Sequence, residues 1–270
     1  MQTISVNGYN MAYLELGDGP PLVCIHGTLG DFRTWSAVLG PLSKTRRVIS
    51  VSLRHFFPEH WDGFGDDYLM AQHVADVIGF IEELDTRPVD LMGHSRGGHI
   101  SFRVAEQRPE LLRKLILVGP GGELDSSLDP IATPGASQRA AGIAASAEKI
   151  RAGDIDGAVK DFFETIEGDG AWARLPAAPK QQLCDNAFTL IGQVGERRRP
   201  YTRAEAESIK TPTLFLAGAE TKGALPTVLR ALAAHVPGAK TAMISGAGHW
   251  MFEQAPPEFC KIVLEFLAPA

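Results

Sequence analysis

The sequence predicts an α/β fold, with a wide, mostly parallel sheet and helices on both faces. Six short, mostly apolar runs suit strands buried on both faces, at residues 22–25, 48–51, 89–92, 115–118, 213–216 and 241–244. Helix-like stretches alternate with these runs, most clearly at residues 70–84 and 258–267. This alternation is typical of a doubly wound sheet.

The chain is expected to open with an antiparallel hairpin. Residues 3–6 and 11–16 alternate between apolar and polar side chains around Asn7-Gly8. An Asn-Gly pair favours the left-handed backbone that a tight hairpin turn requires. The parallel strands follow this hairpin along the chain.

The alternation of strands and helices is interrupted once, after Val118. Residues 119–208 are rich in Ala, Gly and charged side chains. They contain no convincing strand, but helical patterns occur near residues 137–152, 156–165 and 180–191. We interpret residues 119–208 as a helical cap inserted between two strands of a core that comprises residues 1–118 and 209–270.

Charge and composition exclude several classes of partner. The 270 residues carry a formal net charge of -6 with no basic stripe, so a nucleic-acid partner is not expected. The basic run at residues 197–199 is expected to be a solvated loop or helix end. No signal-like start and no bilayer-spanning apolar stretch are found, so we expect a cytoplasmic protein without a membrane partner. A monomer and a homodimer both remain open.

The pentapeptide Gly93-His94-Ser95-Arg96-Gly97 follows a strand-like run and precedes a helix-like stretch. This Gly-x-Ser-x-Gly pattern between a strand and a helix indicates a nucleophile elbow, a sharp turn that holds the serine in a strained conformation. Glycines flank the serine because neighbouring chain passes too close for side chains. Ser95 is therefore predicted to be the nucleophile.

A serine nucleophile needs a base within hydrogen-bonding reach and donors for the oxyanion that forms on attack. His249 follows the last predicted strand in a loop of small residues, and this place after the serine favours it as the base over a histidine that merely packs in a loop. The glycine-rich turn at residues 26–30 follows the first parallel strand. We predict that the N–H groups of Thr28 and Arg96 form the oxyanion hole.

The order of these motifs resembles the α/β-hydrolase superfamily, specifically its capped members with a Ser-His-acid triad. The resemblance rests on His26-Gly27, the elbow, the inserted cap and Gly248-His249, and it covers nearly the whole chain. It implies an α/β-hydrolase fold with the cap inserted after the strand that follows the elbow helix. Related epoxide hydrolases and haloalkane dehalogenases place Asp at the nucleophile position, so the serine makes this chain unlike them.

The acid of the triad is missing from the positions that the resemblance implies. The usual Asp falls on Thr221, with Glu220 one position earlier. A minority that resembles zearalenone-type lactonases places the acid immediately before a Pro-Gly-Gly, where this chain has Gly119. Three explanations remain open: the acid was lost or removed, Glu123 or Glu220 replaces it, or the chemistry tolerates its absence.

Residues 54–61 bring one arginine, two histidines and three aromatic side chains to the rim where Ser95 is expected. We interpret this segment as a wall of the binding pocket. A metal bound by His55, Glu59 and His60 is the less favoured interpretation, because their spacing matches no strong motif.

Together these features predict a serine hydrolase that cleaves a carboxylic ester or lactone of a small, partly apolar molecule through an acyl-enzyme on Ser95. No cofactor and no metal are expected. A carbon–carbon bond hydrolase or a perhydrolase would use the same serine, since fold and motif alone do not fix the substrate. A ligand-binding pseudoenzyme that lacks the triad acid is the third possibility.

Overall fold

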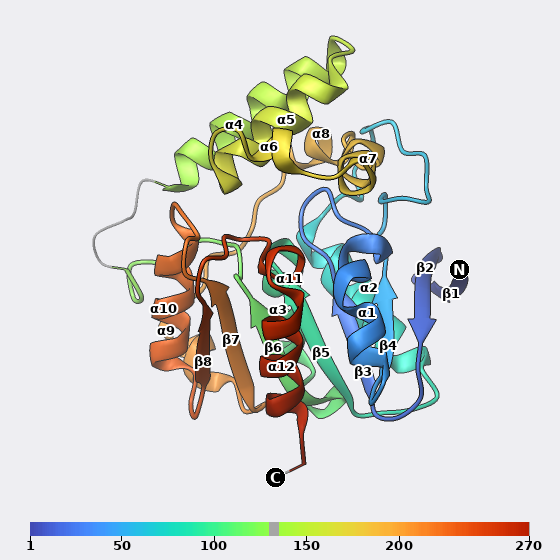
Figure 1. Ribbon diagram of the computed structural model, residues 1–270, viewed down its shortest axis with the longest axis vertical. Coiled ribbons are helices and arrows are strands. Elements are labelled where there is room, and N and C mark those ends of the chain that lie inside the picture. The colour runs from blue at the N-terminus through green and yellow to red at the C-terminus, as the bar shows by residue number, and fades with distance from the viewer. Residues whose placement is uncertain (130–134, 270) are drawn as a thin grey trace.

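The computed structural model describes residues 1–129 and 135–269. Eight strands form one sheet in the order β1-β2-β4-β3-β5-β6-β7-β8, with helices on both faces (Figure 1). The strands are β1 (Gln2–Val6), β2 (Tyr9–Leu16), β3 (Pro21–Ile25), β4 (Arg47–Val51), β5 (Val89–His94), β6 (Leu112–Val118), β7 (Thr213–Gly218) and β8 (Lys240–Ile244). The α/β fold predicted from the alternating pattern is confirmed.

The opening hairpin forms as the Asn-Gly pair predicts. Asn7 and Gly8 have φ values of 49° and 74°, the left-handed region that a tight turn uses. β1 pairs antiparallel with β2, and β2 pairs antiparallel with β4. The remaining strands are parallel, and β3, β5 and β7 are buried along their whole length. Burial on both faces explains why these strands are continuous apolar runs.

The core helices form one layer on each face of the sheet. One face is covered by α2 (Met70–Glu83), α3 (Arg96–Gln107) and α10 (Leu225–His235), whose apolar side chains belong to one buried cluster. The other face is covered by α1 (Ser36–Ser43), α11 (Met251–Gln254) and α12 (Pro256–Leu267), whose cluster continues into the insertion. Two short 3-10 helices, η1 (Phe32–Trp35) and η2 (Pro109–Leu111), precede α1 and β6.

A helical insertion lies between β6 and β7. It contains α4 (Gly135–Arg151), α5 (Ile155–Glu167), α6 (Ala171–Arg174), α7 (Ala177–Asp185), α8 (Thr189–Val194) and α9 (Arg203–Ser208). Figure 1 shows α4 to α8 above the carboxyl ends of the strands, whereas α9 lies beside α10. A parallel bridge between Leu124 and Tyr201 joins the two ends of this insertion. The division of the chain at residues 118 and 208 stays a prediction.

The single helix predicted near residues 180–191 is instead two helices, α7 and α8, which are separated around Asn186. The Asn186 amide donates to Asp31 Oδ2 at 2.7 Å and accepts from the Phe57 N–H at 2.7 Å. These contacts tie the insertion to the core loops, and tertiary demands of this kind override local helix propensity.

The prediction that residues 197–199 form a solvated loop or helix end is wrong for Arg198. Its side chain is 6% exposed and lies 2.9 Å from the Glu196 carboxylate, whereas the neighbouring Arg199 is exposed and pairs with Glu106. Arg198 can be buried although it lies in a basic run, because it pairs with the buried carboxylate of Glu196. In the part of the chain that the structure describes, no helix is long and apolar enough to cross a membrane.

Candidate active site

Ser95 occupies a strained turn between β5 and α3. Its φ and ψ are 51° and -111°, a conformation that residues with a side chain rarely adopt. The Ser95 N–H donates to the Val118 carbonyl at 2.9 Å, and its carbonyl accepts from the Gly121 N–H at 2.9 Å. A β-carbon at Gly93 or Gly97 would overlap neighbouring carbonyl oxygens, so the absence of side chains on both sides is required. The structure therefore has the backbone of a nucleophile elbow.

The two amides predicted for the oxyanion hole lie at the ends of β3 and β5. Neither the Thr28 N–H nor the Arg96 N–H donates to another backbone group of the described residues. The turn that carries Thr28 is fixed by His26, whose Nδ1 lies 2.8 Å from the Gly27 carbonyl and whose Nε2 accepts from the Leu53 N–H at 3.0 Å. Burial lowers the pKa of His26 to about 4, so it acts as a neutral brace.

His249 lies in the loop between β8 and α11 and is 2% exposed. Burial, and then the positive charge of Arg139, lower its pKa to about 4. Among the described residues, neither Nδ1 nor Nε2 of His249 has a hydrogen-bond partner. The ring is therefore neutral near neutral pH, and no hydrogen bond joins it to the Ser95 hydroxyl in this structure.

The loop that carries His249 is held from below by the elbow. His94, the residue before Ser95, lies with its Nε2 3.0 Å from the His249 carbonyl oxygen. The two imidazole rings have centroids 4.4 Å apart. Burial, followed by the neighbouring His249, keeps the pKa of His94 well below its ordinary value. A neutral His94 thus donates its Nε2 proton to the His249 carbonyl and helps to fix the position of His249.

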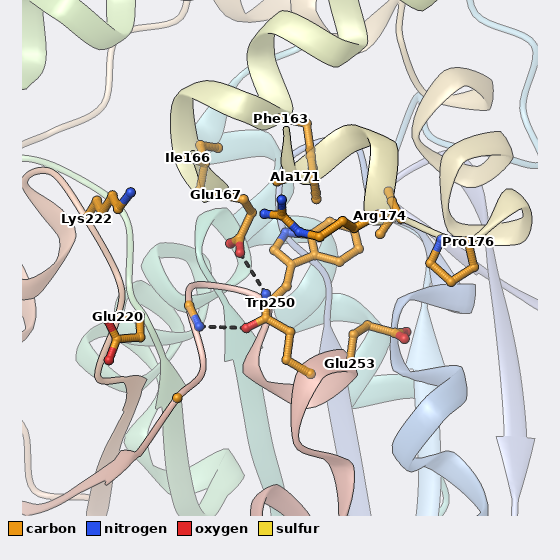
Figure 2. A pocket seen from close by; sticks show the side chains of 14 residues that line it. Phe163, Ile166, Glu167, Ala171, Arg174, Pro176, Glu220, Lys222, Trp250 and Glu253 are labelled. Atoms are coloured by element: carbon orange, nitrogen blue, oxygen red, sulfur yellow. Dashed lines mark hydrogen bonds between the residues drawn. The ribbon is translucent and has the colours of Figure 1, made fainter. Parts of the chain in front are cut away.

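The insertion holds the same loop from above. Gln254 donates to Glu167 Oε2 at 2.8 Å and accepts from the Gly248 N–H at 2.6 Å. Glu167 ends α5, and Figure 2 shows it beside Trp250 in a second cavity, of about 500 Å³. Burial raises the pKa of Glu167. The position of His249 therefore depends on both the core and the insertion.

The candidate acids are separated by the structure. Glu220 lines the second cavity (Figure 2), which neither Ser95 nor His249 lines. Glu123 is exposed at the cavity that holds Ser95, and no hydrogen bond from it reaches His249. Gly119, in contrast, directly follows β6 with φ 50°, and a β-carbon there would lie 2.8 Å from His249 Nδ1. No described carboxylate occupies the Nδ1 side of the base.

Ser95, His249 and Thr28 line one cavity of about 440 Å³ beneath the insertion. Its wall is mostly apolar, with contributions from Leu29, Ile143, Phe162, Phe163, Ile166, Leu225, Val228 and Trp250. Its charged lining residues are Glu123, Asp129, Arg139, Arg198 and Lys222. A mostly apolar pocket with a few converging polar groups is the usual form of a small-molecule site.

The prediction that residues 54–61 form a wall of this pocket is wrong. None of them lines the cavity that holds Ser95. Arg54 is instead paired with the buried Asp76 at 2.8 Å. His55 lies between Glu59, at 3.0 Å, and Asp67, at 2.8 Å, and stacks on Trp61. The polar side chains of this segment pair with residues outside the cavity, and the composition of the segment does not reveal these contacts.

Arg96 contributes a side chain as well as its amide. The guanidinium is fully buried, 2.5 Å from Glu196 and 2.8 Å from His73 Nδ1. Glu196 also accepts from Arg198 at 2.9 Å, and although burial opposes it, the charge of Arg96 followed by that of Arg198 keeps the pKa of this carboxyl far below its ordinary value. This buried trio links the elbow helix to the insertion.

Sequence reasoning did not single out His94, Arg139 or Glu167. His94 lies inside the elbow motif, so its position next to Ser95 could have marked it as a candidate site residue. Arg139 and Glu167 lie on helices of the insertion and reach the site only through tertiary packing. No local pattern distinguishes them from other charged helix residues.

The comparisons with known proteins agree with this geometry. The chain is 26% identical to an sn-1-specific diacylglycerol lipase of Mus musculus over 274 residues, which cover 92% of this chain and 81% of that protein. It is 33% identical over 116 residues to a 2-hydroxymuconate semialdehyde hydrolase of a Pseudomonas species, covering 40% of this chain and 39% of that protein. The chain spans 35% of the length of the uncharacterized mycobacterial proteins that it matches at 33% identity over 122 residues.

The solved structure of an enol-lactonase from Burkholderia xenovorans superposes with a TM-score of 0.76, covering 98% of this chain and 99% of that one. Its sequence identity is 20%, so it bears on the fold alone. A family model described as the alpha/beta hydrolase family matches residues 22–262. With the eight-stranded sheet, the elbow and the helical insertion, this match shows that the chain belongs to the α/β hydrolase family.

Proposed function

We propose that the chain is a serine hydrolase that cleaves a carboxylic ester or lactone of a small, partly apolar molecule. His249 accepts the Ser95 hydroxyl proton as the serine oxygen bonds to the carbonyl carbon, and the Thr28 and Arg96 amides stabilise the oxyanion. The imidazolium then protonates the departing alkoxide. Water, deprotonated by His249, attacks the acyl-enzyme, and the acid leaves as Ser95 regains its proton.

The observation that carries this proposal is the strained Ser95 in the same cavity as a buried, neutral His249. Strain at a non-glycine residue persists only where the surrounding structure enforces it, and such positions cluster at active sites. The free amides of Thr28 and Arg96 supply donors beside that serine. A cavity of about 440 Å³ with an apolar wall suits a small substrate.

The test compares the wild type with Ser95→Ala on short-chain p-nitrophenyl esters. We expect turnover that Ser95→Ala abolishes, and stoichiometric labelling of Ser95 by a fluorophosphonate, read by mass spectrometry of the tryptic peptide. Ser101→Ala, on the same helix, is the matched control and should keep both properties. Ester turnover that survives Ser95→Ala, or a folded wild type that takes up no label, would exclude the proposed mechanism.

A ligand-binding pseudoenzyme is the second candidate, and the empty Nδ1 side of His249 is the observation that favours it. Losing the orienting carboxylate costs a serine protease about 10⁴ in turnover. This candidate predicts saturable binding of a small ligand in the Ser95 cavity with no measurable hydrolysis. Labelling of Ser95 by the fluorophosphonate would argue against it.

Carbon–carbon bond hydrolysis is the third candidate. It draws on the matched Pseudomonas hydrolase, which aligns with 40% of this chain. The same serine and base would serve, so the discriminating measurement is turnover of a vinylogous diketone compared with that of an ester of equal size. A higher kcat/KM for the diketone would replace the ester proposal.

A further inference from the structure

Arg139 is a cation in the Ser95 cavity that has no direct ion-pair partner among the described residues. It lies on α4 of the insertion and lines the cavity together with Ser95 and His249. No hydrogen bond or ion pair joins its guanidinium to any residue that the structure describes. Arg139 is half-buried, and a partly desolvated cation that lacks a direct partner is suited to hold a ligand anion.

The charges around Arg139 are of both signs. Burial, then Arg198 and Arg96, lower its pKa to about 9, and the carboxylates of Glu196 and Glu123 oppose this less strongly. Glu196 is already shared between Arg96 and Arg198, so the trio keeps one positive charge in excess. Asp129 is a further carboxylate in the lining of this cavity. Arg139 is still protonated near neutral pH.

We propose that the substrate of this hydrolase carries a carboxylate close to its scissile ester or lactone bond, and that Arg139 binds this carboxylate. A planar guanidinium matches a carboxylate in a two-pronged hydrogen bond. The inference rests on the proposed function of the same cavity and specifies its substrate class.

Two features set where that carboxylate lies. Arg139 lines the same cavity as Ser95 and His249, so an anionic group bound to it shares that cavity with the reacting carbonyl. The rest of the cavity wall is mostly apolar and suits the uncharged part of the molecule. An anion on Arg139 would also remove the charge that disfavours the imidazolium of His249.

The test uses two esters that differ by one methyl group. Mono-p-nitrophenyl glutarate has a free carboxylate, and in p-nitrophenyl methyl glutarate the same carboxylate is masked. We expect the wild type to prefer the acid in kcat/KM by about 10- to 100-fold, as charge-assisted hydrogen bonds imply. Arg139→Gln should remove this preference, and Arg139→Lys should keep part of it. Arg151→Gln, at the far end of α4, is the control and should leave the preference intact.

A binding measurement separates this inference from the proposed function. We expect monomethyl glutarate, but not dimethyl glutarate, to raise the Tm of Ser95→Ala, and Arg139→Gln to remove that shift. Turnover without a preference for the acid overturns the carboxylate site and leaves the hydrolase. Preferential binding of monomethyl glutarate without turnover of either ester overturns the proposed hydrolase activity and retains the carboxylate site. The absence of both turnover and a Tm shift overturns both proposals.

Two further outcomes would reassign the site. Loss of the preference in Lys222→Gln, while Arg139→Gln keeps the preference, would move the anion site to Lys222, another cation of the lining. A Tm shift with inorganic phosphate but none with monomethyl glutarate would replace the carboxylate with a phosphate. Each of these results overturns the assignment made here.

Discussion

A β-carbon on Gly119 would lie 2.8 Å from Nδ1 of His249. Gly119 directly follows β6, and His249 Nδ1 has no partner among the described residues. That distance is an overlap, so any side chain at this position requires the imidazole to shift. A carboxylate there would then face the Nδ1 edge of the ring, where the acid of a Ser-His-acid triad stands. The geometry thus supports the interpretation that Gly119 occupies the place of a missing acid.

Gly119→Glu is expected to raise kcat on aryl esters by at least about ten-fold, within the roughly 10⁴ that an orienting carboxylate can contribute. A carboxylate at Nδ1 would fix the tautomer and stabilise the imidazolium. The side chain would also strain the backbone, because φ is 50°, at a cost of about 1–3 kcal/mol of folding free energy. Parallel kcat and Tm measurements separate these two effects.

Gly119→Gln is the matched control for that substitution, since it fills the same space without charge. An equal gain in both variants would show that packing, rather than a carboxylate, improves the site. A folded Gly119→Glu protein with unchanged kcat would contradict the assignment of this position.

The acid limb of the pH profile should report His249. Only neutral imidazole accepts a proton, so kcat/KM for an uncharged ester should be present above the pKa of about 4 and fall as the pH drops through it. Arg139→Gln removes a charge that lowers this pKa, so the limb should move to higher pH. Burial, followed by the charge of His249, also keeps the pKa of the neighbouring His94 well below its ordinary value. Arg151→Gln is the control, and a limb that stays fixed or moves to lower pH in Arg139→Gln would refute the electrostatic coupling.

Glu196→Gln should destabilise the fold by about 3–5 kcal/mol, because it leaves the buried Arg96 and Arg198 without their shared carboxylate. The lowered pKa of Glu196 means that its contribution is present above the ordinary carboxyl pKa and is lost as the pH falls through the folded-state value. Urea unfolding at neutral pH measures the loss. Glu207→Gln, an exposed position on α9, serves as the control; equal stability of the two variants would show that the trio contributes nothing.

Acid should destabilise the folded chain through its buried histidines. The pKa values of His26, His73, His94, His99 and His249 are all lowered, chiefly by burial. Between the unfolded pKa near 6.5 and these lower values, the unfolded chain binds protons that the folded chain does not. The free energy of unfolding therefore decreases as the pH is lowered through this range. His55 acts in the opposite direction: burial lowers its pKa, but Glu59 and Asp67 outweigh burial and raise it.

The variant His99→Phe isolates one of these groups. When the pH is lowered from about 7 to about 5, the free energy of unfolding should decrease less in this variant than in the wild type, by about 2 kcal/mol. This is the contribution of one histidine that is protonated only in the unfolded chain. His60→Gln, which changes an exposed side chain, should follow the wild type. An unchanged pH dependence in His99→Phe would mean that His99 is protonated in the folded state.

The sequence was most informative where the physics is local. Continuous apolar runs, the Asn7-Gly8 turn and the glycines around Ser95 each state a backbone requirement, and the structure has the sheet, hairpin and elbow that they predict. The break between α7 and α8 was not predictable, because it depends on Asn186 contacting Asp31 and Phe57 far away in the chain. Arg139 was missed for the same reason, since only packing of α4 over the sheet brings it to the cavity.

The buried trio of Arg96, Glu196 and Arg198 also sets what can be exchanged between relatives. Arg96 starts the helix behind the nucleophile, whereas the other two stand near the end of the insertion. A chimera that receives a foreign insertion would keep the elbow cation and discard its counter-ion. Grafting that aims at new specificity should therefore keep the native residues at positions 96, 196 and 198 together. Both crossover points then lie between positions 96 and 196.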